Sequence, residues 1–455
     1  MNSTSSESVI DALDLLIKSA QAAGATDCDG LAVERESVEV RVRLGEIENV
    51  TVARERRVGL RCLVDGATAV ASTANLNAAS LRDFARQIVE MARILPRDEY
   101  AGLPEAGSIA RQPWPDLAII DPDAPLPEPA QAADLARRAE TRARSADPRI
   151  SNSDGAEMGA SRGRVAYAST AGDFRGAFES SRFGLSVAPI AEQDGKMQRA
   201  GWGHSTRRLQ DLESPESIGA EAARRTLRSL GARRVPTARL PVIFEAPVAA
   251  GLLGHLASAI SGGTLYRGTS FLREALGTRI LPEFVQIVDD GRRIGGLATR
   301  PFDGEGLPTR RTNLVENGIL RSFLLDTYSA RRLGMASTGN ASRGVGGSPG
   351  AGATNLKLMP GEQSLEQMIA GIQQGLLITG LSGMGVNLVT GDYSRGATGH
   401  WIENGELAFP VEEITVAGNL REMFLGIEAI GNDPRPDSTV SCPSLRLPPL
   451  TIGGS

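Results

Sequence analysis

Residues 391–420 have the sequence GDYSRGATGHWIENGELAFPVEEITVAGNL, and this segment decides the fold of the second half of the chain. The pair Asn404–Gly405 lies near its middle, and Asn-Gly supplies the positive φ angles that a type I′ hairpin turn requires. A second Asn-Gly pair occurs within Val315–Ile319. The glycine-rich sequence around both turns predicts a C-terminal domain that is rich in strands, either β-barrel-like or sandwich-like.

The first half of the chain alternates between two periodicities, which predicts an α/β-mixed domain with antiparallel strands. Val38, Val40 and Val42 alternate with charged residues, as in a strand with one face in water. Apolar residues spaced three or four apart instead predict helices. The predicted strands span 30–74 and 150–205, and the predicted helices span 7–23, 78–95, 130–146 and 213–231. The fold class expected for the whole chain is therefore α+β.

Proline marks the crossover inside the first domain. Eight prolines lie within residues 96–129, and such a stretch cannot form regular structure. We predict the main boundary near 232–240, which gives an N-terminal α+β domain over 1–235 and a C-terminal strand-rich domain over 236–455. The second domain is expected to begin with a strand at 240–244 and a helix at 247–261, with short helices at 364–374 and 419–429.

Composition limits the environment and the partners of the protein. A net charge of −5 gives no basic excess, so we expect neither nucleic-acid nor membrane binding. The three cysteines are widely spaced and odd in number, which argues against a disulfide framework. The opening residues, MNSTSSESVIDALDLLIK, have no basic region followed by an apolar run. We therefore expect a cytoplasmic location.

The segment Gly339–Gly352, GNASRGVGGSPGAG, is the first candidate for binding. A phosphate loop would need G-x-x-x-x-G-K-[ST], and no Lys-Ser/Thr pair follows here. A flexible loop that contacts a substrate fits the sequence better. The candidate substrate-binding residues in and beside this loop are Asn340, Arg343, Thr354 and Asn355.

The sequence contains residues for two kinds of hydrolase site, a serine nucleophile site and a zinc site, and both are disfavoured. Gly391–Gly396 with the nearby His400 has the spacing G-x-x-S-x-G, not the G-x-S-x-G of a nucleophile elbow. A zinc site would need His255, His400 and Cys442 to come together from distant positions, and no two histidines occupy adjacent helical turns. No catalytic or metal-binding residue is assigned, and the residues alone leave the function open.

Several stretches in consistent order over 240–442 resemble the TldD/PmbA family, whose members were once labelled modulators of DNA gyrase. The segment 391–420 is the most specific of them. The others are Ser261–Leu272, Pro301–Gly306, Glu316–Leu320 and Asp326–Arg331.

The resemblance implies a two-subunit metallopeptidase in which TldD-type chains carry H-E-x-x-x-H on a helix. Counting back from Arg267–Ser270, the two histidine positions fall on Leu253 and Ser258, and the glutamate position falls on Gly254. None of these side chains provides a strong zinc ligand or a base. The chain therefore resembles the PmbA (TldE) type, with no cofactor of its own and zinc expected in a TldD-type partner.

This resemblance implies a heterodimer with a TldD-type chain, or a homodimer, that admits unfolded or extended peptides and cleaves them. Two alternatives stay open at this point. The chain could act alone as a peptide-binding or regulatory protein without proteolytic activity. It could also be a freestanding hydrolase whose site the sequence does not reveal.

Overall fold

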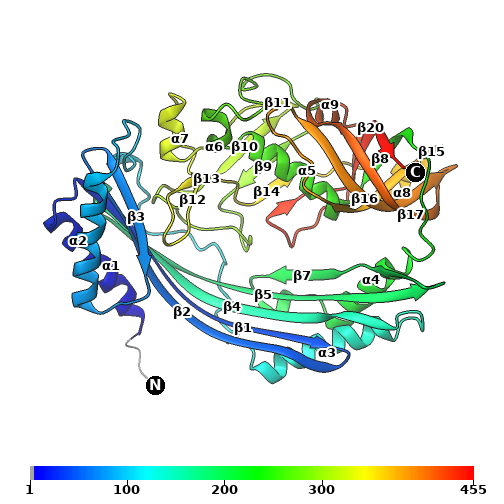
Figure 1. Cartoon of the computed structure of the whole chain (residues 1–455), viewed down its shortest axis with the longest axis horizontal. Coiled ribbons are helices and arrows are strands. Elements are labelled where there is room, and N and C mark those ends of the chain that lie inside the picture. The colour runs from blue at the N-terminus through cyan, green and yellow to red at the C-terminus, as the bar shows by residue number, and fades with distance from the viewer. Residues whose placement is uncertain (1–4, 455) are drawn as a thin grey trace.

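In the computed structural model, which describes residues 5–454, one antiparallel seven-stranded sheet organises the first half of the chain (Figure 1). Its strands follow the order β3-β2-β1-β4-β5-β6, and β7 also pairs with β5. The strands are β1 (Asp27–Arg43), β2 (Glu46–Val64), β3 (Ala67–Thr73), β4 (Asn152–Ser169), β5 (Phe174–Gln193), β6 (Lys196–Arg199) and β7 (Trp202–Thr206). The antiparallel strands predicted for the first half are confirmed.

Two pairs of helices pack against opposite ends of this sheet. The helices α1 (Ser5–Ala22) and α2 (Ala78–Ile94) share a core with the end of β1 that contains Cys28. The helices α3 (Pro129–Arg144) and α4 (Pro215–Leu227) share a core with Val38, Val40 and Val42. The buried face of α3 consists mainly of alanines, so the helix lies close to the sheet.

A closed barrel organises the second half. Its five strands are β8 (Ala238–Phe244), β15 (Gln374–Ser382), β16 (Asp392–Glu403), β17 (Glu406–Asn419) and β20 (Leu445–Gly453). Pairing between β17 and β20 closes the barrel. At the turn from β16 to β17, Asn404 and Gly405 have φ angles of 52° and 80°. The barrel-like form of the predicted strand-rich domain and the predicted turn are both confirmed.

A second sheet and several short helices pack beside the barrel around one large apolar core. This sheet contains β9 (Ile287–Asp290), β10 (Arg311–Glu316), β11 (Ile319–Leu320), β14 (Leu356–Leu358) and β19 (Val440–Ser441). The helices are α5 (Ala246–Ala259), α6 (Gly262–Tyr266), α7 (Thr327–Arg332), α8 (Leu365–Ala370) and α9 (Leu420–Leu425). The remaining short elements are β12 (Ala341–Ser342), β13 (Gly350–Ala351), β18 (Ala429–Ile430) and single 3-10 turns at 106–108, 171–173 and 209–211.

The prolines of 96–129 accompany a long crossover between α2 and α3 that has one 3-10 turn and no strand. This crossover touches the second half of the chain, because the Ala110 amide donates to the Gly306 carbonyl and the Gly295 amide donates to the Leu117 carbonyl. The α+β fold class is confirmed, while the division at residues 235 and 236 stays a prediction. Across residues 5–454, no helix is both long and apolar enough to cross a membrane.

Candidate functional site

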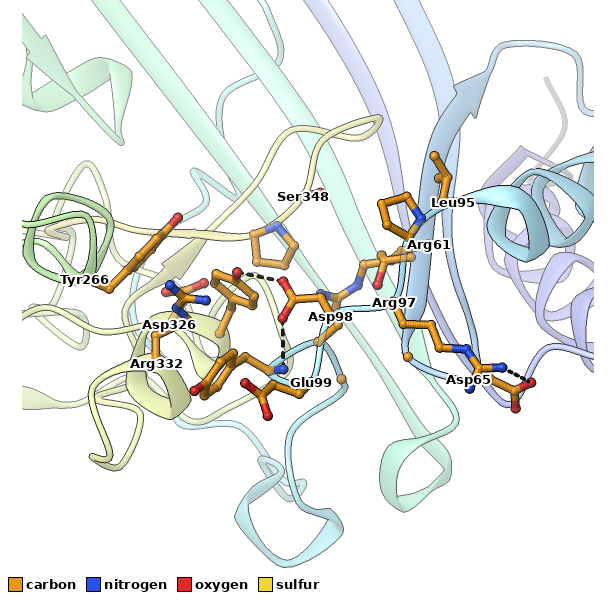
Figure 2. Close-up of a pocket in the computed structure, with 18 residues that line it drawn as sticks. Arg61, Asp65, Leu95, Arg97, Asp98, Glu99, Tyr266, Asp326, Arg332 and Ser348 are labelled. Atoms are coloured by element: carbon orange, nitrogen blue, oxygen red, sulfur yellow. Dashed lines mark hydrogen bonds and ion pairs between the residues drawn. The ribbon is translucent and has the colours of Figure 1, made fainter.

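A cavity of about 1130 Å³ lies where the two halves of the chain face each other (Figure 2). The first half contributes Arg61 from β2 and the segment 95–102 that follows α2. The second half contributes Tyr266 from α6, Tyr328 and Arg332 from α7, and the loop residues Ser348 and Pro349. Both halves must therefore be in place to form this cavity.

A second cavity of about 450 Å³ adjoins the first. The two share four lining residues, namely Tyr266, Asp326, Tyr328 and Pro349. The second cavity continues along the backbone of 350–353 and reaches the end of α5 at Ala257 and Ser258. We call the two cavities together the cleft.

Aromatic rings and guanidinium groups form one wall of the cleft. The rings of Tyr266 and Tyr328 meet edge to face with their centroids 5.5 Å apart. The Arg332 guanidinium lies 4.7 Å from the ring centroid of Tyr100 and 5.4 Å from that of Tyr266. Arg267 also stacks on Tyr266, at 5.2 Å. Such a wall offers flat apolar surface together with cationic hydrogen-bond donors.

The segment 95–102 is fixed to α7 by polar contacts. The Tyr328 hydroxyl donates to Asp98 Oδ2 at 2.7 Å, and this hydrogen bond, with burial, raises the pKa of Tyr328 to about 12. The Arg331 guanidinium donates to the carbonyl oxygens of Tyr100 and Leu103. Tyr328 is therefore protonated at neutral pH and positions the segment instead of acting as a base.

A group of buried charges lies behind the cleft. Asp29 accepts hydrogen bonds from Arg61, from Tyr167 and from Arg343 of the glycine-rich loop. Burial opposes ionisation of Asp29, but the charges of Arg61 and Arg343 outweigh it and hold its pKa at about 2. Glu305 lies 3.6 Å from Arg61, and burial raises its pKa to about 7 although Arg61 opposes the shift. These groups join the first sheet to the loop that borders the cleft.

The four predicted substrate-binding residues face inward and have partners inside the chain. Asn340 Nδ2 donates to Asp289 Oδ2 at 2.8 Å, and the Thr354 amide donates to the other oxygen of the same carboxylate at 2.7 Å. Asn355 Nδ2 donates to the Asp290 carbonyl and to the Thr299 hydroxyl. The side chain of Arg343 is fully buried against Asp29.

The structure thus brings Asn340 and Thr354 together at Asp289 and places Arg343 and Asn355 elsewhere. None of the four lines either cavity of the cleft, whereas residues 348 and 349 line the first cavity and residues 349–353 line the second. Contact between these four side chains and a peptide stays a prediction. The sequence reasoning did not find Tyr100, Tyr266 or Arg332, because they come together only when the proline-rich segment packs against α6 and α7.

The end of α5 does not offer a set of metal ligands. Leu253 is buried with 3% of its surface exposed, and the Ser258 hydroxyl donates to the Gly254 carbonyl at 2.9 Å. The imidazole of His255 packs against the ring of Tyr393, and burial, aided by Arg395, lowers its pKa. The donor chemistry at this helix therefore does not fit zinc.

The other histidine and cysteine positions lie apart. His400 Nε2 contacts the Arg228 carbonyl at 2.9 Å, and Cys442 is buried, which raises the pKa of its thiol. Within residues 5–454, no three His, Cys, Asp or Glu side chains gather in a way that could hold a metal ion. On β16, Ser394 and His400 are six residues apart, which separates them by roughly 20 Å along an extended strand. The serine and histidine considered from the sequence as parts of a hydrolase site therefore do not form a catalytic triad.

Family models match three consecutive parts of the chain. Residues 28–92 match domain 1 of the PmbA/TldA metallopeptidases, 122–230 match the central domain, and 237–454 match the C-terminal domain.

Curated relatives match over nearly the full length. The chain is 38% identical over 449 residues to Metalloprotease PmbA of Escherichia coli O157:H7, covering 98% of this chain and 96% of the relative. It is 35% identical over 422 residues to a Metalloprotease PmbA homolog of Haemophilus influenzae, covering 91% of this chain and 90% of the relative.

Solved structures share the whole fold. A candidate modulator of DNA gyrase from Bacteroides thetaiotaomicron superposes with a TM-score of 0.91 at 28% identity, covering 98% of each chain. TldE from Thermococcus kodakarensis superposes with a TM-score of 0.86 at 23% identity, covering 97% of this chain and 100% of the other.

Proposed function

The chain belongs to the PmbA/TldD metallopeptidase family, and we propose that within this family it is the subunit that carries no zinc of its own. Its role is to complete a two-chain peptidase together with a zinc-bearing TldD-type partner. The substrate class is unfolded or extended peptide. The protein is placed in the cytosol, which its three unpaired, buried cysteines support.

The chemistry of α5 carries this proposal. The positions that correspond to the ligands and the base of zinc-bearing members hold Leu253, Gly254 and Ser258. A buried leucine and a glycine have no donor atom in their side chains, and the hydroxyl of Ser258 is already hydrogen-bonded to its own helix. Yet α5 still ends at the cleft, as expected for a fold retained without its own metal site.

The cleft supports a role in holding peptide. Its wall of Tyr100, Tyr266 and Arg332 can stack on side chains and receive carboxylate groups. The backbone of 350–353 lines the second cavity, and open space surrounds the position where Gly350 would carry a Cβ. A peptide can therefore approach this backbone closely and bind through main-chain hydrogen bonds, which require no particular sequence.

Co-expression with a zinc-bearing TldD-type chain tests the proposal. We expect gel filtration to show a complex and an unstructured peptide to be cleaved only when both chains are present. Elemental analysis of this chain alone should find zinc well below one ion per chain.

A double variant of the aromatic wall tests the role of the cleft in the same assay. Tyr266→Ala combined with Arg332→Ala should lower kcat/KM of the complex about five- to thirtyfold, because each of the two lost stacking contacts contributes on the order of 0.5–1 kcal/mol. Arg292→Ala removes an exposed arginine that lines neither cavity and should leave the rate unchanged.

Three results would favour the other functions. Cleavage by the isolated, zinc-free chain would indicate a freestanding hydrolase. Peptide binding without any gain from the partner would indicate a peptide-binding or regulatory protein that acts alone. One tightly held zinc ion per chain would contradict the assignment to the zinc-free type.

A further inference from the structure

Two of the three cysteines face each other across neighbouring strands of the first sheet. Cys28 on β1 lies directly opposite Cys62 on β2. Directly opposite residues of an antiparallel pair point to the same face of the sheet. Both cysteines accordingly belong to the core that α1 and α2 cover (Figure 1). The spacing of the cysteines along the chain does not reveal this pairing, because it depends on the register of a long hairpin.

The hydrogen bonds of Cys28 show which kind of cross-strand pair the two cysteines form. The Cys28 amide donates to the Thr170 hydroxyl at 3.1 Å, and the Cys28 carbonyl accepts from the Thr170 amide at 2.9 Å. Thr170 directly follows β4, so both backbone groups of Cys28 point away from β2. Cys28 and Cys62 are therefore a non-hydrogen-bonded pair, in which opposite Cα atoms are roughly 4.5 Å apart.

This arrangement suits a disulfide. Disulfide-bonded cysteines have Cα atoms roughly 4.4–6.8 Å apart and Cβ atoms roughly 3.5–4.5 Å apart. Opposite Cβ atoms in a sheet are separated by about 4.5–5.5 Å, and they are closer in non-hydrogen-bonded pairs. The two side chains therefore need to approach each other by only about 1 Å, which a small adjustment of the strands can provide.

We propose that Cys28 and Cys62 form a site of reversible oxidation, which a small disulfide such as oxidised glutathione converts into a cross-strand disulfide. One cysteine, as its thiolate, attacks the small disulfide, which gives a mixed disulfide and releases one small thiolate. The other cysteine, as its thiolate, attacks the protein sulfur of the mixed disulfide and releases the second small thiolate. The two protein thiols are oxidised, the small disulfide is reduced, and the two protons pass to the released thiolates.

Burial keeps both thiols unreactive while the core is closed. Cys28 and Cys62 are each 0% exposed. Burial, with the nearby Asp29, raises the pKa of Cys28 to about 12. Burial also raises the pKa of Cys62, and the neighbouring Cys28 adds to this shift. Because the thiolate is the form that reacts, exchange requires the core to open.

Helix α1 controls this opening. Cys28 Sγ donates to the Ile17 carbonyl at 3.8 Å, so α1 lies directly over Cys28. Leu13 and Leu16 of the same helix are buried in the shared core. Local movement of α1 exposes the thiols without unfolding the rest of the chain. Cys442 lies in the separate core of the second half and stays protected during this movement.

The next residue pair places the site beside the buried charges behind the cleft. Asp29 lies opposite Arg61, and both side chains point to the other face of the sheet. Arg61 donates to Asp29 there and also lines the first cavity. A cross-link between the cysteines would therefore fasten β1 to β2 one residue away from this ion pair. The inference concerns the sheet and does not rest on the proposed function.

Mass spectrometry of the folded chain after treatment with oxidised glutathione tests the cross-link. The mass of the wild type should fall by that of two hydrogen atoms, and non-reducing digestion should yield peptides that join Cys28 to Cys62. Dithiothreitol should reverse both changes. Cys442→Ala is the matched control and should be oxidised in the same way. Cys28→Ala should form no internal link, because Cys62 can then give only the mixed disulfide.

Leu16→Ala tests the role of α1, because it removes a buried side chain that holds the helix on the sheet. The variant should form the disulfide at least fivefold faster than the wild type, with Cys442 unmodified. Leu447→Ala makes the same change at a buried position of the barrel and should leave the rate within about twofold of the wild type. Circular dichroism of each variant confirms that it is folded.

Urea unfolding measures whether the link fastens the sheet. The oxidised wild type should unfold at a urea concentration about 0.5–1 M higher than the reduced protein, because a cross-link restricts the unfolded chain. Cys28→Ala treated in the same way should show no such shift. An unchanged midpoint in the linked protein would contradict the fastening of β1 to β2.

Three outcomes would overturn the proposed site. In the first, the folded wild type and Leu16→Ala both stay reduced. In the second, the folded wild type yields only mixed disulfides. In the third, the Cys28–Cys62 link forms only in denaturant. Equal acceleration by Leu16→Ala and Leu447→Ala, with Cys442 modified as well, would show that global unfolding and not α1 exposes the thiols.

Discussion

Asp29 and Glu305 are buried carboxyl groups that both lie near Arg61, and their pKa values move in opposite directions. Asp29 receives hydrogen bonds from Arg61 and Arg343, which overcome its burial and hold its pKa at about 2. Glu305 is 3.6 Å from Arg61, and among the described residues no second cation pairs with it, so burial dominates and raises its pKa to about 7. At neutral pH, Asp29 is charged and Glu305 is partly protonated.

Glu305→Gln should change how stability depends on pH. In the wild type the folded state binds the Glu305 proton more tightly than the unfolded chain, whose carboxyl has a pKa near 4.5. The free energy of unfolding should therefore fall as pH rises from about 4.5 to 7, by on the order of 2–3 kcal/mol. The glutamine side chain of the variant cannot titrate and can still accept the hydrogen bond from the Thr327 amide. Urea unfolding at pH 5 and pH 8 measures this difference.

The other buried titratable groups do not obscure the difference in pH dependence between the wild type and Glu305→Gln. Asp29 has a lowered pKa, so its stabilising contribution is lost only as pH falls through about 2, outside the measured window. Burial lowers the pKa of His255 and His400, which makes stability rise with pH, but equally in both proteins. Identical pH slopes for wild type and Glu305→Gln would contradict the assignment.

At the scale of elements, the predicted helices and strands lie close to those observed where periodicity is strong. The helix predicted at 7–23 spans Ser5–Ala22, and the one predicted at 78–95 spans Ala78–Ile94. The short helices α6 (GGTLY) and α7 (TYSARR) were not predicted, because neither has the apolar residues at i, i+3 and i+4 that are present in α8 and α9. These two helices carry Tyr266, Tyr328 and Arg332, so the cleft wall was missed for the same reason.

The glycine-rich loop shows the limit of sequence reasoning for a site. Its composition predicts a flexible loop that contacts a substrate, and residues 348–353 line the cleft, while contact with a substrate stays a prediction. The predicted contacts are polar side chains, but Asn340 and Arg343 face inward to carboxylates on distant segments. Asp289 and Asp29 are 51 and 314 residues away, and no local pattern indicates such partners.

Deleting Gly344–Ala351 should abolish most partner-dependent cleavage while leaving the barrel folded. The loop forms part of both cavities, and its glycines allow close approach of a peptide backbone. We expect at least a tenfold loss of kcat/KM with the TldD-type partner present. A matched deletion of Gly383–Gly385 removes glycines that line neither cavity of the cleft and should retain activity. An active loop deletion with normal folding would identify the loop as a connector.

At the scale of the whole molecule, the ion pair between Arg343 and Asp29 connects the first sheet with the second half of the chain. Arg343→Met should lower the free energy of unfolding by about 2–4 kcal/mol, because it leaves a buried carboxylate with one cation fewer. It should also let the two halves unfold at different urea concentrations. Hydrogen exchange over 27–206 and over 238–453, measured separately, would show this uncoupling.

Arg310→Met serves as the control because Arg310 is exposed. It should change stability by less than about 0.5 kcal/mol. A single unchanged unfolding transition in Arg343→Met would show that the halves are held together mainly by other contacts, such as the Tyr328 hydrogen bond to Asp98.

Closure of the barrel also has a consequence for the order of events during synthesis. Strand β8 at Ala238–Phe244 lies between β15 and β20, and β20 begins only at Leu445. As the nascent chain leaves the ribosome, the strands of the first sheet are complete once Thr206 has emerged. The barrel, by contrast, has an open seam on both β8 and β17 until translation has passed Gly453. During that interval the seam is exposed to chaperones and to other unfinished chains.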